Sequence, residues 1–346
     1  MQDPAPITRL FRSKASSELM TVAACHFQVF DKLEKGPLSL ADLQNTLGLK
    51  PRPAMVMLPA LLAMDLLEYT DDGRVKNTGL GALLVSGNPL NLTGYIGLEK
   101  NAAGVLAMVN WLKNDGPENR SQGLSYIKDE EAESPMDDPE AALFFTMALA
   151  GRARLLSPIV ADKVSRSSGC LLDIAGGTGF YAYEWLATNP AATGIVFDRP
   201  EVLNTAGKLF EEWGAAHPDI YNSVKDRIGF LPGDMLVDPL PPADIALASS
   251  LFHDWPEQTC QQLAVKFAAA LNPGGELWIH DAFLNDSLDG PIAVTDYSAM
   301  LFLGTKGRAY SRQEYKNWLT EAGLTPSAAN MSTMMDYGLL SAVKFK

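Results

Sequence analysis

Cysteine and histidine are scarce in this chain, and neither is spaced as a metal ligand set. The 346 residues include three cysteines and four histidines. No Cys-x-x-Cys pair and no Cys/His spacing typical of zinc occurs, so the sequence predicts neither a disulfide framework nor a metal site. We interpret Cys25, Cys170 and Cys260 as buried thiols.

The chain also lacks a hydrophobic run long enough to cross a membrane. The first twenty residues contain no apolar core of signal-peptide length. The most apolar window, residues 141–151, ends at Arg152, well short of the roughly 20 residues that a spanning helix needs. We therefore expect a cytoplasmic protein without a membrane partner.

An excess of positive charge is absent throughout. The formal net charge is −13, with 28 Lys and Arg against 41 Asp and Glu. The two signs balance up to residue 95, and the acidic excess lies beyond it. Because binding to a phosphate backbone needs a basic surface, the composition argues against a nucleic-acid partner.

Residues 1–95 have the pattern of a winged helix. Apolar residues at helical spacing recur in three segments (18–36, 39–49 and 53–67), and an Asp72-Gly73 turn between short extended flanks follows them. A DNA-binding winged helix inserts a cationic helix into the groove, whereas the third segment has only Arg52 near its start. We expect its apolar face to pack against a second subunit, which predicts a dimerisation domain.

The rest of the chain divides into a helical connection, residues 96–165, expected to contribute to an acceptor pocket, and an α/β domain, residues 166–346. From Gly169 onward short apolar runs alternate with helical segments, which is the pattern of a doubly wound, Rossmann-like domain with a parallel sheet. Ligands of such sheets bind beyond the carboxyl ends of the strands. One ionisable residue there would be interpreted as a helix cap or a turn former, but five together predict a site. The five are Asp173, Asp198, Asp234, His253 and Asp281.

A glycine-rich loop follows the first of these runs. Gly176, Gly177 and Gly179 lie between the run and a helical segment, so a ligand can approach the backbone and an anion can meet the helix N-terminus. The spacing Gly177-x-Gly179-x-x-Ala182, with Asp198 about twenty residues later, also satisfies a dinucleotide fingerprint. The loop alone therefore leaves NAD and S-adenosylmethionine as alternatives.

The carboxylate before the loop distinguishes the two cofactors. Asp173 lies three residues ahead of Gly176, where it would disfavour a pyrophosphate but would suit the ammonium group of a methionine moiety. Asp198 is then the expected partner of the ribose hydroxyls, while Asp234 and Met235 would accept from the adenine amino group and cover its face. The residues thus predict S-adenosylmethionine as the cofactor, with S-adenosylhomocysteine as the product.

Five strings in a fixed order carry a family resemblance: DIAGGTG, FDRPEV, GDM, LFHDWPEQ and LNPGGELWIHDAF. Behind a winged-helix-like first half, this set closely resembles the S-adenosylmethionine-dependent small-molecule O-methyltransferases of the caffeate and acetylserotonin type, over nearly the whole chain. The resemblance implies methyl transfer to a hydroxyl of an aromatic or polyketide-like small molecule of secondary metabolism. It also implies a homodimer through the N-terminal domain, no metal, and a last antiparallel strand, residues 337–346, inserted into the sheet.

The resemblance makes His253, in the HDW string, the general base. A phenol or enol hydroxyl is mostly protonated at neutral pH, and an imidazole with a pKa near 6.5 can take that proton. Asp281 falls where the family has the acidic residue that holds the base; the alternative is a turn residue at a strand end. Asp254 and Glu257 match a capping box, so Asp254 is interpreted as the N-cap of the following helix.

Two positions depart from the family pattern. Ala309 stands where the family usually has a further glutamate, which leaves His253 with one carboxylate partner and predicts a weaker base or a more acidic acceptor. Ser249 replaces a lysine that is common ahead of the HDW string, at a position expected to contact the cofactor. These replacements keep an N- or C-methyltransferase, or a relative diverged in catalysis, as alternatives.

Four apolar residues are candidates for the acceptor pocket. Phe145, Leu149, Met300 and Phe302 occupy positions that line the acceptor site in relatives, and they predict a flat apolar acceptor. The alternative is that these side chains belong to the hydrophobic core, as such stripes at helical spacing often do. From other classes, a winged-helix regulator with a ligand-sensing domain and a nicotinamide oxidoreductase are the remaining alternatives.

Overall fold

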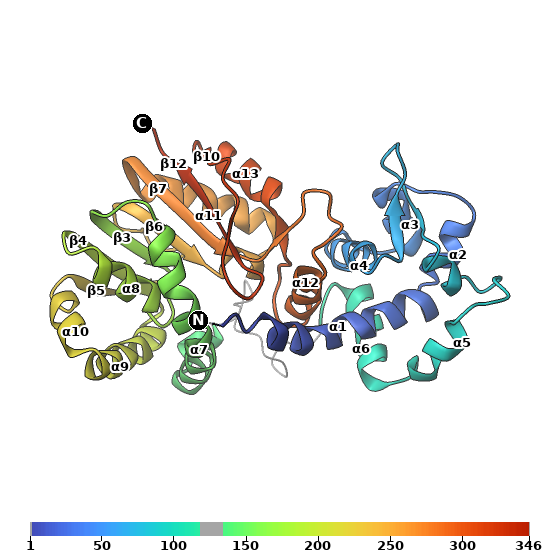
Figure 1. The fold of residues 1–346 in the computed structure, drawn as a ribbon, viewed down its shortest axis with the longest axis horizontal. Helices are drawn as coiled ribbons and strands as arrows, with labels where there is room; N and C mark the ends of the chain where they lie inside the picture. Colours follow the sequence, from blue (N-terminus) through green and yellow to red (C-terminus); the bar gives the residue numbers. More distant parts are fainter. Residues whose placement is uncertain (1, 118–133, 346) are drawn as a thin grey trace. The chain divides into compact units, whose positions relative to one another are not determined.

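The computed structural model describes residues 2–117 and 134–345, which form two compact units (Figure 1). The first unit comprises Met1–Ser125 and Phe283–Arg312, and the second comprises Tyr126–Ala282 and Gln313–Lys346. The sequence pattern predicts three consecutive parts, 1–95, 96–165 and 166–346. In the structure the expected connection is divided between the two units. Phe283–Arg312 belongs to the first unit because its apolar helix packs there.

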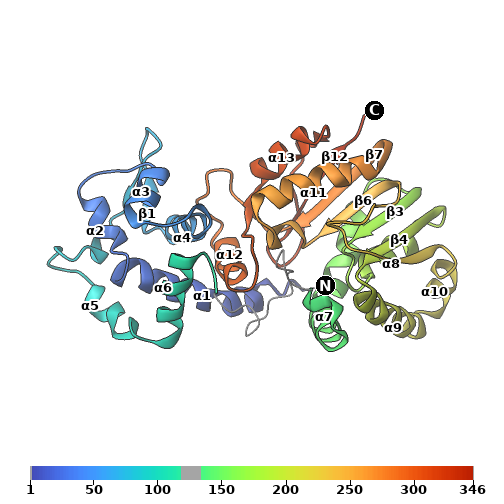
Figure 2. The ribbon, with the colours of Figure 1, turned by 180° about the vertical axis from the view of Figure 1, so that it is seen from behind.

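The first unit consists mainly of helices with one antiparallel hairpin (Figures 1 and 2). Ser39 caps the third helix by accepting a hydrogen bond from Asp42 N at 3.0 Å, and Gly73 turns the hairpin with φ at +78°. The predicted helices and hairpin of a winged helix are therefore confirmed. The elements of this unit are α1 (Ala5–Cys25), α2 (Val29–Glu34), α3 (Leu40–Leu47), α4 (Pro51–Ala63), β1 (Leu67–Tyr69), β2 (Val75–Asn77), η1 (Gly81–Leu84), α5 (Thr93–Ile96), η2 (Gly97–Glu99), α6 (Ala103–Asn114), β8 (Phe283–Leu284), α12 (Ile292–Gly304) and β9 (Tyr310–Ser311).

The core of the first unit joins α1, α4 and α12. Leu19, Met57 and Phe302, one from each helix, are fully buried in a single hydrophobic cluster. The guanidinium of Arg52 lies 4.6 Å from the centroid of the Phe302 ring, and its Nε donates to Gly307 O at 2.9 Å. Arg52, in the first turn of α4, therefore has a structural role inside this unit.

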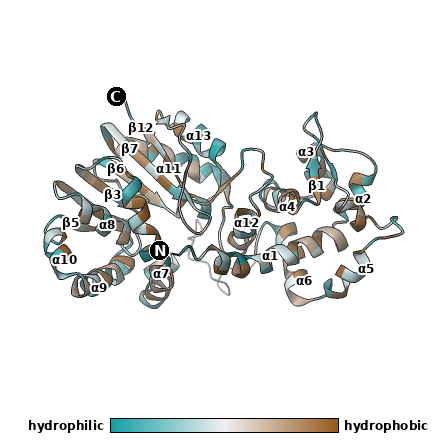
Figure 3. Ribbon diagram, in the orientation of Figure 1, coloured by the Kyte–Doolittle hydropathy of each residue, from teal (hydrophilic) through white to brown (hydrophobic). Residues whose placement is uncertain are grey.

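The second unit is built on a sheet of eight strands in the order β10-β12-β7-β6-β3-β4-β5, with β11 also paired to β12. Strands β3 to β7 are parallel to one another, and β12 lies between β7 and β10, antiparallel to both. Figure 3 shows hydrophobic residues along β6 and β7, as expected for strands covered on both faces. The doubly wound sheet and its inserted last strand are confirmed. The strands are β3 (Gly169–Ile174), β4 (Ala192–Asp198), β5 (Ile228–Pro232), β6 (Ala243–Ser249), β7 (Leu271–Asp281), β10 (Thr325–Pro326), β11 (Met331–Ser332) and β12 (Gly338–Val343).

Helices cover both faces of this sheet. Figures 1 and 2 show α7, α8 and α9 on one side and α11 and α13 on the other. Among the described residues, α7 alone is long and apolar enough to cross a membrane by length and composition. It packs against α8 and α9, and its Arg154 lies 5.0 Å from the centroid of the Phe180 ring, so α7 is an integral part of this unit. The helical elements are η4 (Pro135–Asp137), α7 (Pro139–Lys163), α8 (Phe180–Thr188), α9 (Pro200–Ala216), α10 (Pro218–Val224), η5 (Phe252–Asp254), α11 (Glu257–Ala270) and α13 (Arg312–Glu321).

The strand register brings the carboxyl ends of the parallel strands to one edge. Ile174, the last residue of β3, pairs with Phe197 of β4 and with Ala248 of β6. Asp198, the last residue of β4, pairs with Pro232 of β5. The residues that follow these strands therefore lie close together, as the sequence pattern predicts.

Candidate active site

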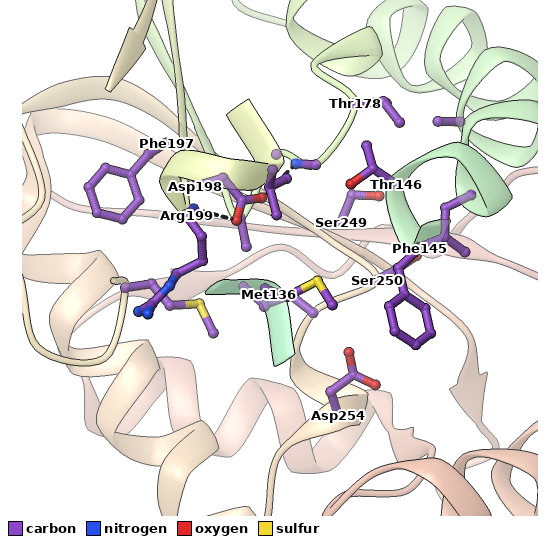
Figure 4. Close-up of a pocket in the computed structure, with 18 of the residues that line it drawn as sticks. Met136, Phe145, Thr146, Thr178, Phe197, Asp198, Arg199, Ser249, Ser250 and Asp254 are labelled. Atoms are coloured by element: carbon purple, nitrogen blue, oxygen red, sulfur yellow. Dashed lines mark hydrogen bonds between the residues drawn. The ribbon is translucent and has the colours of Figure 1, made fainter. Parts of the chain in front are cut away.

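A cavity lies at this edge of the sheet, within the second unit (Figure 4). The glycine loop after β3, the ends of β4, β5 and β6, and one face of α7 form its wall. The structure thus brings together residues that the sequence predicts for one site. Those that line the cavity are Phe145, Leu149, Gly176, Gly177, Asp198, Asp234, Met235 and Ser249.

The glycine loop has a backbone conformation that favours glycine over residues with a side chain. Gly177 and Gly179 have φ of +56° and +75°, and Gly179 is the N-cap of α8. A Cβ at Gly179 would lie 2.3 Å from the Tyr183 hydroxyl oxygen. The NH of Gly177 donates to Asp198 Oδ2 at 2.8 Å, so the loop is fixed against the end of β4. The glycines are therefore required by the path of the backbone beside the cavity.

Asp173 is a buried carboxylate behind this loop. It is 1% exposed, and neither of its oxygens has a hydrogen-bond partner among the described residues. A Cβ at Gly176 would lie 2.8 Å from this carboxylate, so Asp173 sits behind the cavity wall and does not line it. Burial, and then the charge of Asp198, raises the pKa of Asp173 to about 8. A cation on the cavity side of the loop would relieve this cost.

Asp198 stands at the cavity edge of β4. Its Oδ2 accepts from Gly177 N and its Oδ1 accepts from Arg199 N at 2.7 Å. Burial raises its pKa to about 6, against the opposing effect of these backbone hydrogen bonds and of the Arg199 charge. Each oxygen keeps a lone pair that can accept from a ligand hydroxyl.

Arg199 is a residue of the site that the sequence reasoning missed. Its Nη1 donates to Asp234 Oδ2 at 2.6 Å, and its Nε donates to Asp137 Oδ1 at 2.8 Å. Asp234 Oδ1 also accepts from Leu236 N at 2.9 Å. The Asp234 carboxylate is therefore paired with Arg199, and it is less open to an adenine amino group than the sequence predicts. The FDRP string contains the arginine, but nothing in it indicates the pairing with Asp137.

Two serines at the end of β6 face the cavity. Ser249 Oγ is 2.9 Å from His280 Nδ1, and burial lowers the pKa of His280 to about 3, so this histidine stays neutral and structural. Ser250 has a positive φ of 55°, and its buried hydroxyl has no hydrogen-bond partner in the described part of the chain. Opposite, Arg152 of α7 lines the cavity and donates to Tyr337 Oη at 2.9 Å. Sequence reasoning did not single out Ser250 or Arg152.

His253 lies in η5 directly after β6 and is 1% exposed. Its Nδ1 is 2.5 Å from Asp281 Oδ1, at the end of β7, and its Nε2 is 3.5 Å from Asp254 Oδ1. Burial opposes a charged imidazole, but the two carboxylates outweigh it and raise the pKa of His253 to about 9. Burial also opposes the Asp281 charge, yet His253 and further hydrogen bonds hold the pKa of Asp281 below its usual value. The predicted pair exists and is buried. The single carboxylate partner predicted from Ala309 is wrong, because Asp254 is a second carboxylate beside the imidazole.

The capping box predicted for Asp254 is wrong. The N-cap of α11 is Pro256, without a side-chain cap, and Asp254 ends η5. The helix begins later than the motif suggests because a residue directly before a proline disfavours the helical conformation, and Trp255, directly before Pro256, is extended with φ −111° and ψ 151°. The Asp254 side chain instead lies in the cavity wall (Figure 4), next to the outer nitrogen of His253.

Two known domain families match this chain. The O-methyltransferase domain matches residues 107–325, and the O-methyltransferase dimerisation domain matches residues 9–87. The chain belongs to the O-methyltransferase family. The family predicted from the motifs is therefore confirmed. The predicted activity class, an S-adenosylmethionine-dependent O-methyltransferase, is confirmed as well. The match to the dimerisation domain supports a homodimer.

Relatives of this O-methyltransferase align with most of its length. A solved O-methyltransferase family 2 protein of Planctomyces limnophilus, in complex with apigenin, is 38% identical with a TM-score of 0.85, covering 99% of this chain and 96% of that one. A 3-hydroxy-5-methyl-1-naphthoate 3-O-methyltransferase of Streptomyces sahachiroi is 29% identical, covering 92% of this chain and 89% of the relative. An acetylserotonin O-methyltransferase of Rattus norvegicus is also 29% identical, covering 87% of this chain and 68% of the relative.

The four residues predicted for the acceptor pocket of this O-methyltransferase lie in different surroundings. Phe145 and Leu149 of α7 line the cavity (Figure 4). Phe302, in contrast, is fully buried in the core of the first unit against Arg52, as the alternative interpretation predicts. Met300 lies on the same helix, α12, and is partly buried. Its role in acceptor binding stays a prediction.

Proposed function

We propose that this enzyme transfers the methyl group of S-adenosylmethionine to a hydroxyl of an aromatic or polyketide-like small molecule, with His253 as the general base. The observation that carries this proposal is the buried His253–Asp281 pair, 2.5 Å apart, directly beside a cavity with the features of a cofactor site. The names of relatives that act on a naphthoate and on acetylserotonin favour an aromatic acceptor.

The residues of the cavity fit S-adenosylmethionine. Asp198 would accept from the ribose hydroxyls, and Met235 would cover the adenine. Arg152 would meet the methionine carboxylate, while Asp173, buried without a hydrogen-bond partner among the described residues, would favour the ammonium group across the loop. When bound, the cofactor supplies an electrophilic methyl group on a sulfonium. A pyrophosphate at the glycine loop would instead lie near the buried Asp173 carboxylate, and the repulsion between them disfavours NAD.

His253 is suited to accept a proton from a weakly acidic hydroxyl. With a pKa of about 9 it is nearly matched to a phenol, whose pKa is about 10, so proton transfer between them is close to thermoneutral. The cost is that at pH 7 only about one imidazole in a hundred is neutral. Asp281 holds Nδ1, which leaves Nε2 as the atom that takes the proton, and Asp254 lies beside that atom.

The acceptor would bind against the apolar part of the cavity wall. Phe145, Leu149 and Trp255 line it, and an aromatic ring can stack on or pack against these side chains. The dimer would form through the first unit. On α1, Ile7, Leu10 and Phe11 are more than two-thirds exposed, at 71%, 78% and 71%, and such a patch indicates a partner surface.

Two measurements test this proposal. The first is thermal unfolding with S-adenosylmethionine, S-adenosylhomocysteine and NAD: saturation with either of the first two at about a hundred times Kd should stabilise the protein by roughly 2.7 kcal/mol, and NAD should have no effect. The second is methyl transfer to a panel of naphthols and flavones, comparing His253→Asn with His217→Asn, a control on the exposed surface. Stabilisation by NAD alone, or a methyl group found on nitrogen or carbon of the product, would overturn the proposal.

A further inference from the structure

The Asp281 carboxylate accepts hydrogen bonds from two further groups besides His253, a backbone NH and a tyrosine hydroxyl. Its Oδ1 accepts from His253 Nδ1 and from Ala282 N at 2.8 Å, while its Oδ2 accepts from the Tyr315 hydroxyl at 2.8 Å. Tyr315 belongs to α13, and both Tyr315 and Asp281 are fully buried. The tyrosine therefore contacts the carboxylate on the oxygen opposite to the imidazole.

We propose that Tyr315 is a positioning residue that acts on His253 through Asp281, holding the carboxylate in place and sharing its negative charge. This inference rests on the proposed role of His253 as the base. It also bears on the departure at Ala309: the further glutamate of the family pattern is absent, and the carboxylate that holds His253 Nδ1 has a hydroxyl partner.

The ring of Tyr315 is held by packing that does not need its hydroxyl. It makes edge-to-face contacts with Phe252 and Trp318, with ring centroids 5.5 and 5.2 Å apart. The hydroxyl itself reaches the Asp281 carboxylate. Tyr315→Phe would therefore keep the packing and remove one hydrogen bond. The substitution therefore tests the hydrogen bond to Asp281 separately from the packing of the ring.

The direction of the effect follows from the charge on Asp281. A donor on Oδ2 withdraws negative charge from the carboxylate, so its loss leaves more charge facing the imidazole and favours the protonated His253. The other groups that act on His253 are Asp254, in the same 3-10 helix, and Tyr337, which accepts from Arg152 of α7. None of these changes in Tyr315→Phe. We expect the apparent pKa of the His253–Asp281 pair to rise by about one unit.

Histidine NMR measures this coupling without any acceptor. The chain has four histidines, so 13C- and 15N-labelled imidazoles can be assigned by substitution and titrated in the full-length protein. Tyr183→Phe is a matched control, since Tyr183 is fully buried in the same unit and donates to Ala206 O at 3.2 Å. The control should leave the His253 titration unchanged.

A double-mutant cycle shows whether the effect passes through Asp281. Tyr315→Phe should shift the His253 titration in the wild-type background and should have no effect in an Asp281→Asn background. No shift in the wild-type background, or an equal shift in both, would overturn the inference. If Tyr315→Phe unfolds, the 13Cζ resonance of Tyr315 should follow the His253 titration in the wild type and not in Asp281→Asn, and a Tyr315 resonance that does not respond in the wild type would overturn the inference. Failure of wild-type protein to bind S-adenosylmethionine would instead count against the proposed function, so the two failures are distinguishable.

Discussion

Substituting the base should change how the rate depends on pH, as well as its size. In the wild-type enzyme the folded-state pKa of His253 is raised from 6.5 to about 9, so the neutral imidazole is a small minority at pH 7. Because only the neutral form accepts a proton, kcat/KM should rise about tenfold per pH unit from pH 7 and level off near pH 9. His253→Asn should lower turnover at neutral pH by roughly 10²–10⁴-fold, which is the usual effect of removing a general base.

An assay with phenols of different pKa shows whether the ionisation of the imidazole or that of the acceptor controls the rate. In the wild-type enzyme the midpoint of the rising limb should stay near pH 9 whichever phenol is used, because it reports His253. In His253→Asn the residual rate should instead follow the fraction of acceptor already ionised in solution, so its midpoint should move with the pKa of each phenol. Cofactor affinity, measured by calorimetry, should be nearly the same in both proteins, since His253 does not line the cavity.

One result would exclude His253 as the general base. If His253→Asn keeps wild-type turnover at pH 7 on a true acceptor, positioning alone drives the transfer. A midpoint of the wild-type kcat/KM–pH profile that shifts with the pKa of the phenol would lead to the same conclusion. In that case the ionisation of the acceptor, and not that of the imidazole, would set the pH dependence. The His217→Asn control distinguishes either result from a general effect of histidine loss.

Three further outcomes are expected. Asp198→Ala should weaken S-adenosylmethionine binding by roughly 1.5–3 kcal/mol, because hydrogen bonds to a charged group are lost, and unchanged affinity by calorimetry would remove Asp198 from the site. Gly179→Ala should destabilise the enzyme by about 1–3 kcal/mol in thermal unfolding, given its φ of +75° and the close Tyr183 hydroxyl, whereas Gly207→Ala, in an open helical position, should not. The wild type should sediment as a dimer at micromolar concentration and Leu10→Glu as a monomer; a monomeric wild type contradicts the dimer proposed through α1.

The site residues of the second unit can be predicted from the sequence because they follow the carboxyl ends of its strands. In a parallel sheet the carboxyl ends of neighbouring strands meet at one edge, so residues far apart in the chain can be grouped by position alone. This rule predicts Asp198 and Asp234 for the site, and both line the cavity. The same rule brings His253 and Asp281, 28 residues apart, to this edge. The family resemblance predicts that they pair, and they lie 2.5 Å apart.

The contacts that the sequence could not predict come from other kinds of element. Arg199 pairs with Asp137, 62 residues earlier and outside the strand pattern, so no periodicity indicates the contact. Tyr315 reaches Asp281 from α13, where its apolar neighbours make it resemble an ordinary core residue. Phe302 is the opposite case: its position in relatives favours the acceptor pocket, but it belongs to the core, as the alternative interpretation predicts. Spacing identifies which face of a helix is apolar, but it does not identify what that face contacts.

Within the described chain, strained backbone conformations and buried polar groups without a hydrogen-bond partner occur at the ends of β3 and β6 and in the loops that follow them. Ala175 and Ser250 both have positive φ, at 51° and 55°, although neither is glycine. Asp173 carries a buried carboxylate and Ser250 a buried hydroxyl, and neither side chain has a hydrogen-bond partner among the described residues. Each feature costs of order 1–3 kcal/mol and persists only where the surrounding structure imposes it. Their concentration beside one cavity indicates a backbone shaped in advance for a polar ligand, and binding of that ligand should recover part of the cost.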